Sequence, residues 1–121
     1  MKPQLLVIDD DEGIGRVVVR IFEAEHEVTW ANSGRQALEF IAGGTVFDVI
    51  LCDLMMPQMT GMEVHEQVRL KDPAQAALMV FLTGGAFTPR AREFLDATPN
   101  QRIEKPFNVG KLRALVNGLV R

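Results

Sequence analysis

The stretch that decides the fold is Val49-Ile50-Leu51-Cys52-Asp53, in which four apolar residues run directly into a carboxylate. Short, continuously apolar runs are typical of parallel strands that helices cover on both faces. Two other runs share this design, because residues 5–8 lead into Asp9 and residues 79–82 lead into Thr83. We therefore predict three central parallel strands that each deliver a polar group to the same edge of one sheet.

Segments with helical periodicity alternate with these runs along the chain. We expect strands near residues 4–8, 27–31, 48–52, 78–82 and 101–104. We expect helices near residues 13–25, 34–43, 61–71, 88–97 and 108–120. The first helix should bury one apolar stripe, formed by Ile14, Val17, Val18, Ile21 and Phe22. Such β–α units with right-handed crossovers predict the α/β class, with a single doubly wound, five-stranded parallel sheet and five helices on its two faces.

Composition limits the classes of function. The 121 residues are 47% hydrophobic, which is enough for one compact domain over residues 1–121. The net charge of −3 lacks the basic bias of a nucleic-acid-binding surface, so we expect no nucleic acid partner for this chain. No apolar run approaches the roughly 18 residues of a membrane span, so we expect no direct membrane contact. The only cysteine, Cys52, lies inside a predicted strand, and this usage favours a cytoplasmic location.

Acidic residues gather at one edge of the predicted sheet. In a doubly wound sheet, ligands bind beyond the carboxyl ends of the strands, where Asp9, Asp10 and Asp53 should meet. Carboxylates that close repel one another unless a cation neutralises them or some are protonated, and their oxygens suit Mg²⁺. We predict Asp10 and Asp53 as direct ligands, with the backbone carbonyl of Met55 as a third. Asp9 would act through a water molecule, and Asp11 would cap the first helix.

The same edge carries the groups that phosphoryl transfer requires. Asp53 could accept a phosphoryl group as an aspartyl phosphate, and catalysis would then consist of positioning and charge neutralisation. The Thr83 hydroxyl and the Lys105 ammonium would each serve one phosphoryl oxygen, and Gly84 leaves room for a donor. Simpler interpretations stay open: the aspartates could cap a helix, Thr83 could cap a turn, and Lys105 could be a solvated surface lysine. We interpret His65 as a surface histidine on the polar side of its helix.

Several motifs of the chain resemble those of the receiver domain of two-component signalling proteins. They occur in the family's order and cover essentially the whole chain: Leu6–Glu12, Asp48–Pro57, Met59–Met62, Leu82–Gly84 and Glu104–Phe107. The resemblance implies a flavodoxin-like fold with the strand order 2-1-3-4-5. It also implies that Asp53 takes a phosphoryl group from a phosphohistidine, on a histidine kinase or a histidine phosphotransfer domain, with Mg²⁺ bound. Slow hydrolysis of the aspartyl phosphate would be the only other reaction, so we expect no further enzyme activity.

The resemblance further implies how the signal leaves the domain. Thr83 would move toward the phosphate, and this shift would change the face built from the fourth helix, the fifth strand and the fifth helix. A weak homodimer could form through that face. The resemblance also predicts a cis peptide bond between Lys105 and Pro106, because the bend would aim the lysine inward.

The phosphoryl donor is predicted to dock on the first helix and on the loop after the fifth strand. Small residues at Gly13 and Gly15 would let another helix approach closely. Val19 would add an exposed apolar contact, since we place it outside the buried stripe. Pro106 and Phe107 would lie beside these residues, although Phe107 could instead belong to the core.

One position departs from the family pattern. Receivers usually carry an aromatic residue where this chain has Arg102, so we do not expect the usual coupling of the threonine to an aromatic ring. We expect Arg102 to stay solvated or to pair with Glu93 or Asp96. Phosphorylation would then act mainly by reordering the loop from Gly84 to Thr88, whose glycines permit large backbone changes.

Local patterns also bear on the kind of protein that carries the domain and on alternative functions. The stretches Thr83–Arg92 and Pro99-Asn100 resemble receivers at the carboxyl end of hybrid sensor histidine kinases; the alternative is a stand-alone single-domain response regulator. A Mg-dependent phosphatase of the haloacid type would carry a second aspartate where this chain has Met55. An FMN carrier would need a glycine- and hydroxyl-rich phosphate loop where residues 9–12 are acidic. A degenerate receiver that only docks is disfavoured, because the acidic, hydroxyl and ammonium groups are all kept.

Overall fold

A computed structural model of the chain describes residues 2–85 and 87–120 and shows strands alternating with helices. The strands are β1 (Gln4–Ile8), β2 (Glu27–Ala31), β3 (Val49–Asp53), β4 (Met79–Thr83) and β5 (Arg102–Glu104). The helices are α1 (Glu12–Phe22), α2 (Gly34–Ala42), α3 (Gly61–Lys71), α4 (Pro73–Ala76), α5 (Pro89–Ala97) and α6 (Val109–Leu119).

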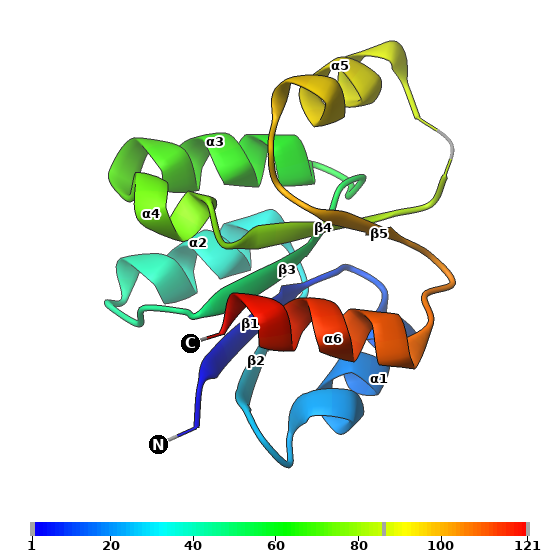
Figure 1. The fold of residues 1–121 in the computed structure, drawn as a ribbon. Helices are drawn as coiled ribbons and strands as arrows, with labels where there is room; N and C mark the ends of the chain where they lie inside the picture. Colours follow the sequence, from blue (N-terminus) through cyan, green and yellow to red (C-terminus); the bar gives the residue numbers. More distant parts are fainter. Residues whose placement is uncertain (1, 86, 121) are drawn as a thin grey trace.

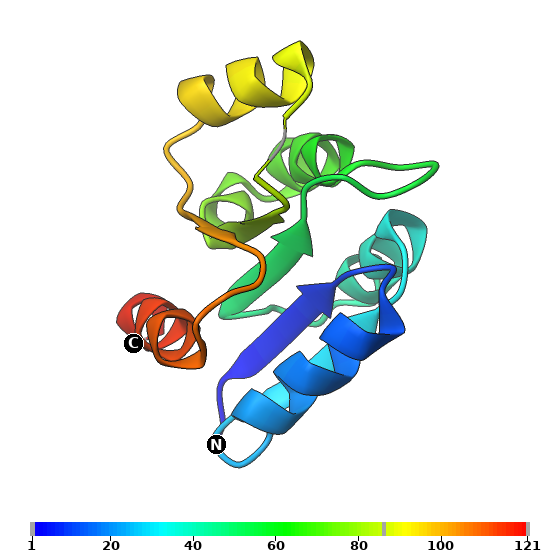
Figure 2. The same ribbon diagram turned by 90° about the vertical axis from the view of Figure 1, so that its right-hand side faces the viewer.

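All five strands form one parallel sheet in the order β2-β1-β3-β4-β5, which confirms the predicted topology. Helices α1 and α6 cover one face, and α2, α3, α4 and α5 cover the other (Figures 1 and 2). Every residue of β3 and β4 is buried, because helices lie on both sides of these strands. This two-sided cover explains why the central strands are continuously apolar rather than alternating.

The strand ends differ from the prediction in a way that matters for function. Strands β3 and β4 each begin and end one residue later than expected, so Asp53 and Thr83 are the last residues of their strands. Asp53 is in register with Leu82, the residue before Thr83. Both side chains are therefore carried by the sheet itself and not by the loops that follow it.

The helices show a further difference. The short helix α4 was not expected, because four residues are too few to show a helical period. Its signal is local instead: Asp72 caps the helix through the Gln75 backbone N–H, and Pro73 occupies its first turn.

Within residues 2–85 and 87–120, no helix combines the length and the apolar character needed to cross a membrane.

The orientation of α1 corrects the predictions for Val17 and Val19. Val17 was expected in the buried stripe, yet 45% of its surface is exposed. Val18 and Phe22 face the core as expected, whereas Val19, which was expected to be exposed, is half-buried. Asp11 caps this helix by accepting from the backbone N–H groups of Gly13 and Ile14, as predicted.

Candidate functional site

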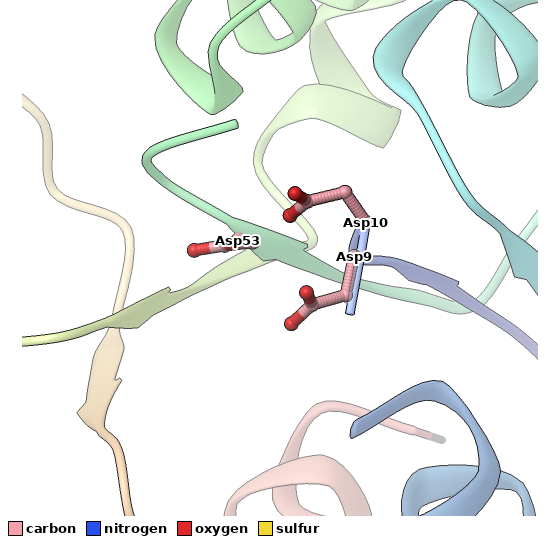
Figure 3. A group of neighbouring side chains, drawn as sticks. All are labelled: Asp9, Asp10 and Asp53. Carbon is pink, nitrogen blue, oxygen red and sulfur yellow. The ribbon is translucent and has the colours of Figure 1, made fainter. Parts of the chain in front are cut away.

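Three carboxylates meet at the carboxyl ends of β1 and β3. Asp9 and Asp10 directly follow β1, and Asp53 ends the neighbouring strand β3 (Figure 3). Each residue offers one carboxylate oxygen within 4.8 Å of those of the other two. The predicted acidic cluster is therefore present, and it results from parallel pairing, which brings the ends of adjacent strands to one edge.

Asp9 is the most enclosed member of the cluster, with none of its surface exposed. One carboxylate oxygen, Oδ1, accepts from the Asp11 backbone N–H at 2.9 Å. The other, Oδ2, accepts from the Lys105 ammonium at 2.8 Å. Both oxygens of Asp9 thus already have protein partners, and its indirect role toward a cation stays a prediction. Asp10 is exposed by comparison, and its carboxylate extends into the cluster toward Asp53 (Figure 3).

Lys105 reaches this cluster from the turn after β5. Its Nζ lies 2.8 Å from Asp9 Oδ2 and 3.5 Å from Asp53 Oδ2. The Lys105–Pro106 peptide bond is cis, as predicted. Burial alone would lower the pKa of Lys105, but the hydrogen bond to Asp9 and the charges of Asp53 and Asp9 raise it above its ordinary value. The ammonium is therefore a permanent positive charge beside Asp53, and it is not the solvated surface lysine of the simpler interpretation.

Asp53 carries the unusual electrostatics of the site. Only 8% of its surface is exposed, and its Oδ1 accepts a long, 3.4 Å hydrogen bond from the Met55 backbone N–H. Burial and, next, the charge of Asp9 raise the pKa of Asp53 to about 6, although Lys105 acts in the opposite direction. One ammonium thus does not balance the carboxylates. A bound cation would relieve this excess negative charge, so the donor set fits a hard divalent metal such as Mg²⁺.

The hydroxyl and the open space required for phosphoryl transfer lie at the end of the next strand. Thr83 is 97% buried, with 3% of its surface exposed, and it ends β4 beside β3. Gly84 follows it, and a Cβ added there would meet no atom within 4 Å. The approach of a donor past this open position stays a prediction. Gly85 adopts a φ of 87°, a conformation that favours glycine.

Two residues that support the site were missed in the sequence. A Cβ at Gly61 would lie 2.4 Å from the Asp53 carbonyl oxygen, so only glycine lets the start of α3 pack against the end of β3. The indole Nε1 of Trp30 donates to the Asp9 carbonyl at 2.9 Å. The lone tryptophan at the end of a strand next to the acidic turn was the available signal for the second contact.

The predicted docking residues are only partly confirmed as a surface. The prediction for Gly15 is wrong, because this residue is buried. A Cβ there would lie 2.5 Å from the Trp30 ring, so the indole occupies the space beside Gly15 that was predicted for a partner helix. Gly13 and Pro106 are exposed, whereas Phe107 is half-buried against the core under α1 and α6. The docking role of these residues is a prediction that the fold leaves open.

The interpretation of His65 as a surface residue is wrong. Only 9% of its surface is exposed, and its ring packs against Phe81 of β4 and Phe94 of α5, with centroids 5.8 Å and 5.3 Å away. Burial lowers the pKa of His65. Helix α3 therefore has a wider buried face than its valines indicated, because it packs against α5 as well as against the sheet.

Arg102 is exposed, in agreement with the prediction, but its contact is different. Its guanidinium Cζ lies 5.9 Å from the centroid of the Phe87 ring, and that of Arg92 lies 5.5 Å from the same centroid. Among the described residues, no ion pair joins Arg102 to Glu93 or Asp96. The sequence pattern did not suggest this arrangement, because it depends on the path of the loop that leads into α5.

Together, the fold and the site define a flavodoxin-like α/β domain with an acidic, cation-type centre next to a buried threonine and an inward lysine. The family model of the response regulator receiver domain matches residues 5–117. The chain therefore belongs to the receiver domain family of two-component signalling.

Known proteins of this family resemble the chain in sequence and in structure. It is 30% identical to the uncharacterized transcriptional regulatory protein YkoG of Bacillus subtilis, over 99% of this chain and 52% of that protein. It is also 30% identical to the transcriptional regulatory protein SrrA of Staphylococcus aureus, over 100% of this chain and 49% of that protein. The chain thus spans about half the length of these relatives.

Solved receiver structures agree with the fold. The chemotaxis protein CheY4 of Vibrio cholerae superimposes with a TM-score of 0.82 and 30% identity, over 99% of this chain and 100% of that one. The receiver domain of the Francisella response regulator 1452 gives a TM-score of 0.80 and 29% identity, over 98% and 96% of the two chains.

Proposed function

We propose that the chain is a phosphoacceptor in which Asp53 takes a phosphoryl group from a phosphohistidine of a histidine kinase or histidine phosphotransfer domain. The observation that carries the proposal is the position of the Lys105 ammonium, 2.8 Å from Asp9 and 3.5 Å from Asp53, at an edge that also holds the Asp10 carboxylate and the buried Thr83. This arrangement surrounds one carboxylate with groups that can receive a dianionic phosphoryl group.

The transfer itself requires little covalent chemistry from the protein. An Asp53 oxygen attacks the phosphorus, the phosphorus–nitrogen bond of the donor breaks, and a phosphorus–oxygen bond forms. The leaving imidazole keeps the electron pair of the broken bond and takes up a proton from solvent. Lys105 offsets the charge of one phosphoryl oxygen, and the Thr83 hydroxyl can donate to another. Water would later hydrolyse the aspartyl phosphate slowly, and we propose no other enzyme activity.

The cation of this reaction would be Mg²⁺, held by Asp10, Asp53 and the backbone carbonyl of Met55, with Asp9 behind them. When bound, it supplies charge neutralisation at a phosphoryl oxygen. The raised pKa of Asp53 supports this assignment, because a carboxylate that is destabilised by burial and by Asp9 gains most from a nearby cation. Lys105 does not replace the metal, since a single ammonium leaves an excess of negative charge among Asp9, Asp10 and Asp53.

Labelling with small phosphodonors tests the proposal. The chain is incubated with acetyl phosphate or phosphoramidate, with and without Mg²⁺, and intact mass is measured. We expect the gain of one phosphoryl group only with Mg²⁺, mapped to Asp53, and none in Asp53→Asn. Asp48→Asn is the matched control, because Asp48 is an exposed aspartate at the opposite end of β3. Full labelling of Asp53→Asn, or labelling mapped to His65, would overturn the proposal.

We further propose that the donor docks where α1 meets the turn before α6. Val17 and Val109 are exposed, by 45% and 41%, on these two helices, which share one core and are joined by a hydrogen bond from Arg113 to the Ile21 carbonyl. Gly13, Val19, Pro106 and Phe107 would complete the surface. Val17→Glu should slow transfer from a phosphorylated partner and leave labelling by acetyl phosphate intact. Val46→Glu is the control, because Val46 is 70% exposed and lies before β3, at the other end of the sheet.

The output face and the wider context complete the proposal. Phosphorylation would reorder the loop between Thr83 and α5, and the face of α5, β5 and α6 would contact the downstream partner or a second copy of the chain. The loop sequence supports a receiver from a hybrid sensor histidine kinase in the cytoplasm, while a stand-alone single-domain response regulator is the alternative. The length of the native polypeptide, measured with an antibody against this domain, separates these contexts.

A further inference from the structure

Asp9 is held by the protein at each of its four polar atoms. Its side-chain oxygens accept from Asp11 and Lys105, as described above. Its backbone N–H donates to the Ala31 carbonyl at 3.1 Å, and its own carbonyl accepts from the Trp30 indole at 2.9 Å. The turn after β1 is thus fixed from β2 by two successive residues, through one backbone contact and one side-chain contact.

The indole reaches the Asp9 carbonyl through a space that is made for it. Trp30 lies in β2, in register with Val7 of β1, and it packs half-buried against the core under α1. A Cβ at Gly15 of α1 would lie 2.6 Å from Nε1 and 2.5 Å from Cε2. Any other residue at position 15 would therefore displace the ring from its hydrogen bond. The ring of Trp30 fills the space beside Gly15, and the N–H group of the ring forms the separate contact with the Asp9 carbonyl.

This contact acts on Asp10, the exposed carboxylate among the ligand candidates. The Asp9 carbonyl and the Asp10 N–H belong to the same planar peptide unit, so a bond to one restrains the other. In the described part of the chain, no hydrogen bond holds the exposed Asp10 carboxylate. The direction of Asp10 therefore depends on the peptide plane that Trp30 restrains.

We propose that Trp30 is a positioning residue for the cation and phosphoryl site, acting through the Asp9–Asp10 peptide. The inference rests on the proposed function, because it assigns a role toward the same metal. The indole N–H donates to the Asp9 carbonyl and would itself be no ligand of the metal. It holds the peptide so that Asp10 is presented toward Asp53, and it thereby lowers the cost of ordering the site when the cation binds.

The test compares Mg²⁺ binding in the wild-type chain and in Trp30→Phe, which keeps a ring and removes the N–H donor. Calorimetric titration gives the Kd without relying on the fluorescence of the replaced residue. We expect the Kd to rise about fivefold to tenfold, the range between one lost neutral hydrogen bond and a lost partner of a metal ligand. Labelling by acetyl phosphate should slow at low Mg²⁺ and recover at saturating Mg²⁺. A Kd within about twofold of wild type would overturn the inference.

Two further variants separate positioning from packing. Val28→Ala removes a half-buried side chain two residues earlier in β2, from the same core, so it should lower the melting temperature and leave the Kd unchanged. Gly15→Ala keeps Trp30 but pushes the indole aside, so it should weaken Mg²⁺ binding like Trp30→Phe. It also decides the question if Trp30→Phe folds poorly.

The outcomes distinguish this inference from the proposed function. Equal weakening of Mg²⁺ binding by Val28→Ala would show a packing effect and overturn the role of Trp30. Normal labelling of the wild type with unaffected variants would overturn that role alone. A wild-type chain that neither binds Mg²⁺ nor becomes labelled would overturn the proposed function itself.

Discussion

The acidic edge and the Arg102 face are built in opposite ways. The acidic edge, formed by Asp9, Asp10, Asp53, Thr83 and Lys105, is centred on β1, β3 and β4, whose residues are almost all buried, and Lys105 alone reaches it from the turn after β5. The Arg102 face, formed by β5, α5 and Phe87, has a three-residue strand with exposed ends. Helix α5 stands at the margin of the molecule in both ribbon views (Figures 1 and 2).

This difference shows where the domain is rigid and where it can respond. Groups that take part in chemistry need fixed geometry, which the central strands and the contacts of Asp9 provide. An output surface must change at low cost, and segments with few buried contacts open most easily. The aromatic contacts of His65, Phe81 and Phe94 join the two regions, since Phe81 lies two residues before Thr83 in β4 and Phe94 lies in α5.

The largest expected effect is a gain of stability at the acidic edge. Burial raises the pKa of Asp53 from 3.8 to about 6, so the folded state opposes its ionisation. The penalty is absent below pH 3.8, develops as the pH rises toward 6 and is complete above it. Without metal at pH 8, Asp53→Asn should therefore stabilise the fold by up to about 3 kcal/mol.

Chemical denaturation at pH 4 and pH 8 measures this effect. The gain should be large at pH 8, small at pH 4, and reduced at pH 8 by Mg²⁺, which binds only the wild-type site. A gain that is equal at both pH values would show that the excess charge of the acidic edge does not cost stability.

A loss of packing is expected where α5 meets the rest of the molecule. Phe94 contacts the rings of Phe81 and His65 at 5.2 Å and 5.3 Å. Because Phe94 is half-buried, Phe94→Ala should destabilise the fold by about 2 kcal/mol, below the range for a fully buried ring. Amide exchange should then speed up first in α5. Phe40→Ala, at a 36% exposed ring on α2, is the control and should leave α5 unaffected.

A smaller, pH-dependent effect is expected at His65. Burial lowers its pKa below 6.5, so the folded state disfavours the charged ring. Its stabilising contribution is complete above pH 6.5 and declines as the pH falls below that value. The melting temperatures of His65→Phe and of the parent should therefore diverge as the pH drops from about 7.5 to about 5, the range in which histidine usually titrates. An Asp53→Asn background removes the opposing titration at the acidic edge, and parallel curves there would contradict the prediction.

The smallest effect is expected at Arg102. Its contact with Phe87 is exposed, so Arg102→Ala should change stability by about 0.5 kcal/mol or less. Amide exchange with and without beryllofluoride, a phosphate mimic, should show changes in the loop after Thr83 in both the parent and the variant. Arg90→Ala, at an exposed arginine of α5, serves as the control. A change centred on β5 that Arg102→Ala erases would instead identify Arg102 as the switch.

The sequence by itself determined the strands and the membership of the site. Apolar runs that end in polar residues identify buried parallel strands, and parallel pairing places their ends at one edge whatever the details of packing. Asp9, Asp10, Asp53, Thr83 and Lys105 could therefore be assembled without coordinates. The cap at Asp11 was predictable for a different reason, because capping depends only on neighbouring residues in the chain.

Only the tertiary structure decided which residues those elements touch. Val17 and Val19 differ in exposure because of the rotation of α1 on the sheet, which the apolar pattern restrains only loosely. His65 is buried because α5 covers the flank of α3, and a periodicity that describes one face cannot show a second neighbour. The pairing of Trp30 with Gly15, and its bond to Asp9, join three separate segments of the chain. Contacts of this kind depend on distances between segments, which only the packed fold sets.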